Sequence, residues 1–233
     1  MLPAIARGKH LSTLAFSESG SGGHFCAPVS PATRNGHADL FSASKSFVTS
    51  AGEADSYVVS VRTAGATGRT ESDLYLISKG AIGFTTLGRF EGLGLAGNAR
   101  APMKLDRVIF DADRRLGPGG SGFQTIMEAV LPHFQIGAAS VSLGIATAAF
   151  WAIASRVSAT RYKHAGGTAL SEIPRVQFLA AEMAIELNSA HAYLQETIRK
   201  ALACDPNVIV DVLGVNAKTA ESCASGFLGA MTL

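Results

Sequence analysis

Up to about Gly122, apolar and polar residues alternate in short runs, a pattern typical of β-strands. In the run from residue 56 to 63, the side chains of Tyr57, Val59 and Val61 would share one face of a strand. Residues 73–79 alternate in the same way after a glycine-rich connection, so the two runs predict a hairpin with a long loop. Further strands are expected around Leu14, Val48, Ile82 and Val108. Many short strands separated by turn residues predict a small antiparallel barrel or sandwich.

After Gly122, apolar residues recur every three or four positions, the period of an amphipathic helix. The clearest case begins near Val176, with Ser171 as a candidate N-cap, and ends before the turn at residues 205–207. Another apolar helix is expected over residues 208–228. Long helices with short links predict an up-down bundle. The fold class is therefore α+β, with a β-domain over residues 1–118 and a helical bundle over 119–233, joined at a Gly- and Pro-rich segment.

No charged residue occurs between Glu128 and Arg156, and about 20 apolar residues are enough to cross a bilayer. Polar residues nevertheless interrupt this stretch, and it is rich in Ala and Gly, whereas lipid-facing spans are richer in Leu, Ile and Phe. We therefore expect a helix buried in the bundle and no membrane span, although this pattern alone leaves the span open as an alternative.

The charge balance and the cysteines exclude several classes of protein. The 233 residues carry 20 Lys+Arg and 18 Asp+Glu without a basic cluster, so no nucleic-acid partner is expected. Cys26, Cys204 and Cys223 are odd in number and widely spaced, which predicts no disulfide scaffold and a cytoplasmic location. The histidines lack the spacing of metal ligands, so no metal site is predicted.

Two glycine-rich segments are candidates for ligand binding. Residues 92–97 match the dinucleotide pattern GxGxxG, but Pro102 follows closely and blocks the helix that this motif must open, so we reject it. The segment from Leu14 to Gly23 runs from a strand into small residues whose N–H groups could face an anion or a polar ring edge. Ordinary Gly/Ser loops show the same composition, so the segment alone does not decide between these readings.

Four segments, in this order and at natural spacing, resemble the middle β-domain of the acyl-CoA dehydrogenase family: LAFSESGSGG, SKSFVTSAGEADSYVVSVRT, GLGLAGNARAPMKLDRVIFD and LGPGGSGF. The helical remainder is similar to that family's C-terminal bundle, and the resemblance covers about residues 11–227. The family's N-terminal helical domain and C-terminal end have no counterpart. The resemblance implies an FAD cofactor, an acyl-CoA substrate, an electron-transfer flavoprotein or other electron acceptor, and a homo-dimer or homo-tetramer formed through the bundle.

The reaction implied by the resemblance is α,β-dehydrogenation of an acyl-CoA thioester, with a glutamate as base and flavin N5 as hydride acceptor. Phe16 and Ser17 would face the isoalloxazine ring, with Ser17 at the place of the family's threonine. Gly22 and Gly23 would lie in the loop at the cofactor, with Gly23 where the family has serine.

Three further positions follow from the same resemblance. Phe47 and Thr49 match the aromatic and the threonine over the flavin, and Arg161 matches an arginine that reaches the FAD diphosphate of a neighbouring subunit. The catalytic residue is unknown, because the base of most members lies beyond the end of this chain. In a minority of members the base aligns with Phe134, which cannot take a proton. A flavin monooxygenase or acyl-CoA oxidase of the same fold, and an inactive truncated homologue, are therefore the alternatives.

Overall fold

The computed structural model describes residues 1–231, apart from the side chains at positions 112, 165 and 225–233. The chain forms two compact units, the β-unit (Met1–Glu128) and the helical unit (Ala129–Leu233), each with its own hydrophobic core. The expected boundary at residue 118 falls inside the β-unit. The reason is that the N–H of Gly120 donates to Asp73 Oδ1 over 2.8 Å, which ties this segment to the sheet.

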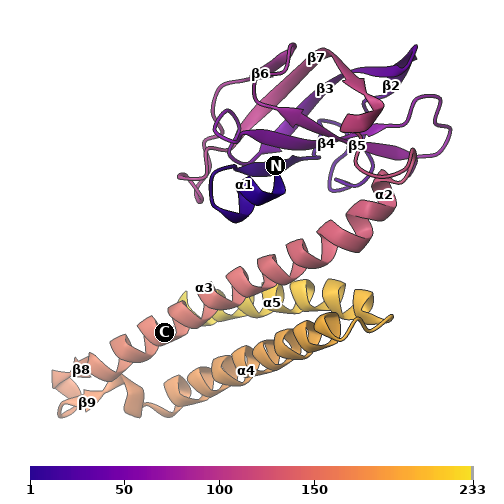
Figure 1. The fold of residues 1–233 in the computed structure, drawn as a ribbon. Helices are drawn as coiled ribbons and strands as arrows, with labels where there is room; N and C mark the ends of the chain where they lie inside the picture. Colours follow the sequence, from indigo (N-terminus) through magenta and orange to yellow (C-terminus); the bar gives the residue numbers. More distant parts are fainter. Residues whose placement is uncertain (232–233) are drawn as a thin grey trace. The chain divides into compact units, whose positions relative to one another are not determined.

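Two sheets make up the β-unit, which begins with the short helix α1 (Leu2–Ala6) (Figure 1). The first sheet has the order β1-β4-β5, from strands Ser12–Ala15, Ser56–Arg62 and Ser72–Ser78. The second has the order β2-β3-β7-β6, from strands Ala32–Asn35, Ala38–Val48, Ala101–Asp111 and Phe84–Thr86. The β-unit ends with a short 3-10 turn (Ala112–Arg114) and helix α2 (Gly122–Thr125). The expected strands near Val48 and Val108 are β3 and β7, whereas β2 was not expected from the pattern.

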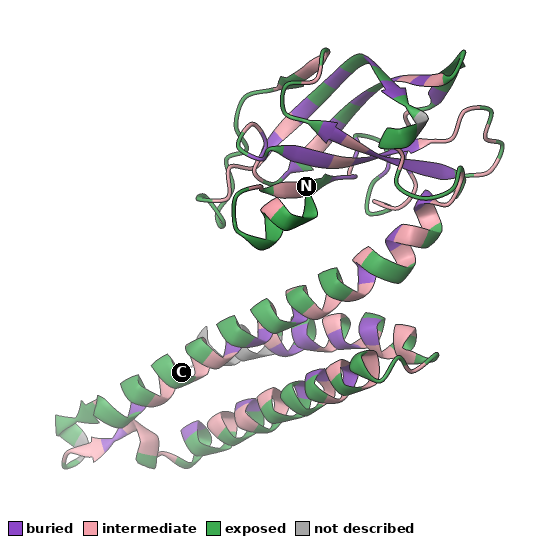
Figure 2. Cartoon of the chain, viewed as in Figure 1, coloured by how far each residue is buried: buried purple, intermediate pink, exposed green. Residues whose placement is uncertain are grey.

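The predicted hairpin is confirmed, since β4 and β5 pair antiparallel with Val59 opposite Tyr75. Tyr57, Val59 and Val61 are fully buried, as the alternation predicts, but Ser60 on the opposite face is also fully buried. Strand β4 is therefore covered on both faces. The strands of the β-unit carry most of its buried residues (Figure 2). Strand β1 differs from the antiparallel expectation because it pairs with β4 in parallel, with Ser12 opposite Ser56.

The rejected GxGxxG segment lies in the connection between β6 and β7, where residues 92–97 form bends and turns and open no helix. Gly83, directly before β6, has a φ of +86°, and a Cβ there would overlap the carbonyl oxygen of Asp106. Only glycine satisfies both constraints at this position.

Three long helices form the helical unit: α3 (Leu131–Ala159), α4 (Pro174–Leu202) and α5 (Val208–Met231). A π-helical turn (Ile126–Val130) precedes α3, and a small hairpin of β8 (Arg161–Tyr162) and β9 (Thr168–Ala169) follows it. All three helices contact one another around a core of Ala139, Leu143, Ala190, Leu194 and Val215. Ser171 does not cap α4: Ile173 occupies the N-cap position, because residues 170–172 form a separate 3-10 turn.

The uncharged stretch becomes α3 and packs against both other helices. The continuous helical segment Gly122–Ala159 is long and apolar enough to cross a membrane, judged by length and composition, and 17% of its most apolar window is buried. The helix thus joins the bundle as expected but leaves much of its apolar surface exposed, including Val141, Ile145 and Trp151.

Candidate functional site

The glycine-rich loop begins where β1 ends, at Phe16 and Ser17. Phe16 is buried and Ser17 is half-buried. The N–H of Ser46, near the end of β3, donates to the carbonyl oxygen of Ser17 over 2.9 Å. This bond brings together two of the segments expected at a cofactor, Phe16-Ser17 and Phe47-Thr49.

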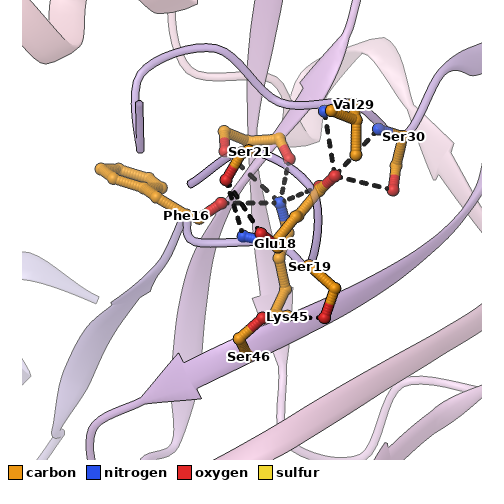
Figure 3. A network of polar contacts seen from close by, with 9 residues as sticks. Phe16, Glu18, Ser19, Ser21, Val29, Ser30, Lys45 and Ser46 are labelled. Atoms are coloured by element: carbon orange, nitrogen blue, oxygen red, sulfur yellow. Dashed lines mark hydrogen bonds and ion pairs between the residues drawn. The ribbon is translucent and has the colours of Figure 1, made fainter. Parts of the chain in front are cut away.

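A buried ion pair, which the sequence pattern did not predict, lies at this junction (Figure 3). Lys45 Nζ lies 2.5 Å from Glu18 Oε1, and the two side chains are 0% and 1% exposed. Lys45 also donates to the carbonyl oxygens of Ser60 over 2.6 Å and of Phe16 over 3.3 Å. Burial lowers the pKa of Lys45, and the charge of Glu18 opposes that shift. A signal existed in the sequence, because Lys45 occupies an inward position of β3 that an apolar residue would normally fill.

The second carboxylate oxygen of Glu18 binds the far end of the glycine-rich loop. Glu18 Oε2 accepts hydrogen bonds from the N–H groups of Val29 and Ser30 over 3.0 and 2.9 Å, and from the Ser30 hydroxyl over 3.0 Å. Both ends of the loop are therefore attached to one side chain.

Phe47 and Thr49, at the end of β3, are exposed. The Phe47 ring is 55% exposed and meets the edge of Phe90 at a centroid distance of 5.4 Å. The guanidinium of Arg100 lies 5.2 Å from the centre of the Phe90 ring. An exposed aromatic platform beside a free hydroxyl is suited to a planar ring with polar edges.

Gly22 and Gly23 lie in the exposed part of the loop. Gly22 has a φ of +56°, a conformation that L-residues rarely adopt, and nothing lies within 4 Å of a Cβ built at either glycine. Both positions therefore leave the backbone open to a ligand.

A cavity of about 650 Å³ lies between this loop and the β4–β5 connection. Its lining includes Ser21 and His24 from the loop, Arg62 at the end of β4, and Thr67 and Arg69 from the connection, and it includes no carboxylate. Arg62 Nη2 donates to a neighbouring carbonyl over 3.1 Å, whereas its buried Nε has no hydrogen-bond partner in the described part of the chain. Two arginines without a facing acid favour an anionic ligand.

The remaining two expected positions belong to the helical unit. Arg161 is exposed in β8, where its Nη1 donates to the carbonyl oxygen of Gly167 over 3.2 Å and lies 3.9 Å from Glu172. Phe134 is 59% exposed in the first turn of α3. Neither residue provides a carboxylate that could act as a base.

The described residues suit a flavin better than a metal. The hydroxyls of Ser17 and Thr49 make no hydrogen bond to any other described residue, so both can donate to the polar edge of a ring. Over the same residues, no group of three His, Cys, Asp or Glu side chains converges to hold an ion. The donors, the exposed aromatic ring and the open loop fit an isoalloxazine group.

Comparisons with known proteins point to one family. Residues 136–226 match the model of the acyl-CoA dehydrogenase C-terminal domain. An acyl-CoA dehydrogenase of Bacillus subtilis is 30% identical over 189 residues, which are 81% of this chain and 49% of that protein. The bovine mitochondrial short-chain specific acyl-CoA dehydrogenase is 30% identical over 183 residues, which are 78% of this chain and 43% of that protein.

The fold agrees with these sequence matches. Butyryl-CoA dehydrogenase from Megasphaera elsdenii superposes with a TM-score of 0.89 at 24% identity, covering 100% of this chain and 60% of that one. The chain spans about half the length of the curated relatives it matches. Sequence and fold together show that the chain belongs to the acyl-CoA dehydrogenase family.

Proposed function

We propose that this chain forms the flavin-binding part of an FAD-dependent oxidoreductase that removes two hydrogens from an acyl-CoA thioester. The observation that carries the proposal is the hydrogen bond from Ser46 to Ser17, which joins two cofactor segments within a fold shared with acyl-CoA dehydrogenases. When bound, the flavin supplies a hydride acceptor for α,β-dehydrogenation.

The residues of this chain bind and orient in the proposed reaction. The hydroxyls of Ser17 and Thr49 donate to the polar edge of the ring, Phe47 packs on its face, and the amides of Gly22 and Gly23 line its loop. Arg161 contacts the diphosphate of a cofactor in a neighbouring subunit. Proton abstraction is assigned to none of these groups, because each of them lacks a carboxylate.

The phosphate groups of the substrate occupy the cavity that Arg62 and Arg69 line. A guanidinium matches a phosphate with its planar fork of donors, and the exposed Arg69 provides such a group at the cavity wall. Arg69→Gln is expected to raise the KM for acyl-CoA without changing FAD binding. Arg7→Gln, at the exposed end of α1, is the matched control.

Flavin binding tests the proposal directly. FAD at about 100 times its dissociation constant stabilises a protein by about 2.7 kcal/mol, so Tm should rise by about 5–10 °C. Thr49→Val should reduce that rise, whereas Thr33→Val, at an exposed site in β2, should not. A colourless protein whose Tm does not respond to FAD would contradict the proposal.

Copies of the chain associate through the helical unit in this proposal. Large apolar side chains are exposed on α3 and α4 of one chain, and exposed apolar surface of this kind often marks a contact with another protein. They are Phe134, Val141, Ile145, Trp151, Phe178 and Ile185. Light scattering should show a dimer or tetramer that Ile145→Lys dissociates and that Ile82→Lys, in the β-unit, leaves intact. A monomeric wild-type chain would refute the association.

Phe134 is the observation that favours the inactive homologue as a second candidate, because it stands where some relatives of this chain carry the base. Dye reduction by acyl-CoA would support the dehydrogenase, with an electron-transfer flavoprotein as the natural acceptor. Oxygen consumption with reduced flavin would instead indicate the oxidase or monooxygenase. Bound FAD with neither reaction would indicate the inactive form.

The three free cysteines suit the reducing cytoplasm in which we place the protein.

A further inference from the structure

The buried pair of Glu18 and Lys45 joins three segments of the β-unit (Figure 3). Lys45 lies on β3, and its ammonium group donates to Glu18, to the carbonyl oxygen of Ser60 on β4 and to that of Phe16 at the end of β1. An ammonium group has three N–H donors, so these acceptors use all of them. The end of β1 is thereby fixed to β4, its partner in the sheet, and to β3 of the other sheet.

The carboxylate extends this constraint to the loop. Glu18 Oε2 accepts bonds from Val29 and from both the N–H and the hydroxyl of Ser30, at the far end of the loop. One side chain thus sets the distance between the two ends of residues 19–28. The loop in turn forms one wall of the cavity that contains Arg62 and Arg69.

Stability alone is a weak explanation for this arrangement. A buried ion pair loses the hydration of both charges, and apolar residues of similar volume often stabilise a fold equally well. Apolar side chains tolerate several packings, whereas this pair satisfies its donors and acceptors in one geometry only. What the ion pair adds, beyond stability, is therefore that it holds the contacted backbone in one conformation.

The backbone that the pair holds in place is the Phe16-Ser17 segment, which is expected to face the flavin. The carbonyl oxygens of Phe16 and Ser17 both turn inward, to Lys45 and to the N–H of Ser46. The Ser17 hydroxyl makes no hydrogen bond to another described residue, so it is available to a ligand. Moving Lys45 or Glu18 would move the Ser17 hydroxyl.

We propose that Lys45 and Glu18 are positioning residues for the flavin, acting through the Phe16-Ser17 backbone and through loop 19–28 without touching the cofactor. This inference rests on the proposed function. The pair holds the loop in the arrangement that binds the ring. A variant whose loop adopts that arrangement one tenth of the time binds FAD about tenfold more weakly.

The paired variant Glu18→Gln with Lys45→Met tests this role. It removes both charges, keeps a similar volume, and leaves an amide oxygen that can still accept from Val29 and Ser30. We expect its cofactor-free Tm to stay within a few degrees of wild type, while the Kd for FAD rises about tenfold. Hydrogen exchange at Val29 and Ser30 should quicken in the cofactor-free protein, a readout independent of catalysis.

A milder variant covers the case in which the paired variant does not fold. Ser30→Ala removes one of the three bonds to Glu18 Oε2 and leaves the pair intact. Ser42→Ala is the matched control, because the Ser42 hydroxyl accepts one N–H bond over 2.9 Å on the exposed face of β3. We expect Ser30→Ala, but not Ser42→Ala, to raise the Kd for FAD about threefold.

The possible outcomes separate this inference from the proposed function. A wild-type chain that binds no FAD overturns both. A wild-type chain that binds FAD, with an equal Kd for the paired variant, overturns the positioning role alone, whatever the change in Tm. If the paired variant does not fold, equal Kd values for Ser30→Ala and Ser42→Ala overturn the positioning role in the same way.

Discussion

Replacing Lys45 with methionine alone should be among the most destabilising single changes in the β-unit. Methionine fills a similar volume but donates no hydrogen bond, so it leaves Glu18 Oε1 charged and almost fully buried. It also leaves the carbonyl oxygens of Ser60 and Phe16 without their donor. Removing one partner of a buried pair costs about 3–5 kcal/mol. At about 4 °C per kcal/mol for a unit of this size, Tm should fall by about 12–20 °C.

A double-mutant cycle measures the interaction within this pair. Lys45→Met, Glu18→Gln and the paired variant are compared with wild type in calorimetric or near-UV circular dichroism melts without FAD. The paired variant should lie within about 1.5 kcal/mol of wild type, because it has no unpaired buried charge. A Lys45→Met variant within about 1 kcal/mol of wild type would refute the reasoning, since Glu18 would then be protonated or hydrated at little cost.

Three further predictions follow from single features of the two units. Gly83→Ala should lower the free energy of unfolding by about 2 kcal/mol more than Gly36→Ala, which has the same sign of φ but open space, and urea melts check this. The pKa of Glu186 is lowered first by its hydrogen bond to a lysine of α5, so its stabilisation is full above about pH 4.5 and disappears as the pH falls through the lower folded-state pKa. The Tm gap between wild type and Glu186→Gln should therefore close in acid, and a gap that is constant with pH would contradict this assignment. Phe134→Glu should raise acyl-CoA-dependent dye reduction at least tenfold by adding a carboxylate, whereas Ile82→Glu, exposed in the β-unit, should leave it unchanged.

The regular elements were predictable because the spacing of apolar residues along the sequence shows which face of a strand or helix packs against the core. Tyr57, Val59 and Val61 alternate, and all three are fully buried in β4. Parallel pairing of β1 was not predictable, because Ser12 and Ser56 lie far apart in the sequence and alternation does not encode the partner of a strand. Ser171 failed as a cap because the intervening 3-10 turn shifts the start of α4, and helix ends are the least predictable part of an element.

The candidate site was predictable only where a family motif covers it. Ser17 and Phe47 were singled out by resemblance, and the structure brings their segments together through Ser46. The buried pair of Glu18 and Lys45 was not predicted, because a charged residue among small residues normally indicates a solvent-exposed position. Only the inward position of Lys45 in β3 distinguishes it from a surface lysine, and that position depends on knowing the register of the strand.

The parallel pairing of β1 with β4 also has a consequence for the order of folding. Ser12 and Ser56 are 44 residues apart in the sequence, and a parallel pair cannot close through a tight hairpin. Such non-local pairings form slowly, because the entropy of the intervening chain is lost before the contacts form. The β4–β5 hairpin can form locally, and β1 then adds to it. During synthesis, β1 therefore leaves the ribosome before its partner β4 and pairs late, so an intermediate with an unpaired β1 exposes a strand edge to aggregation.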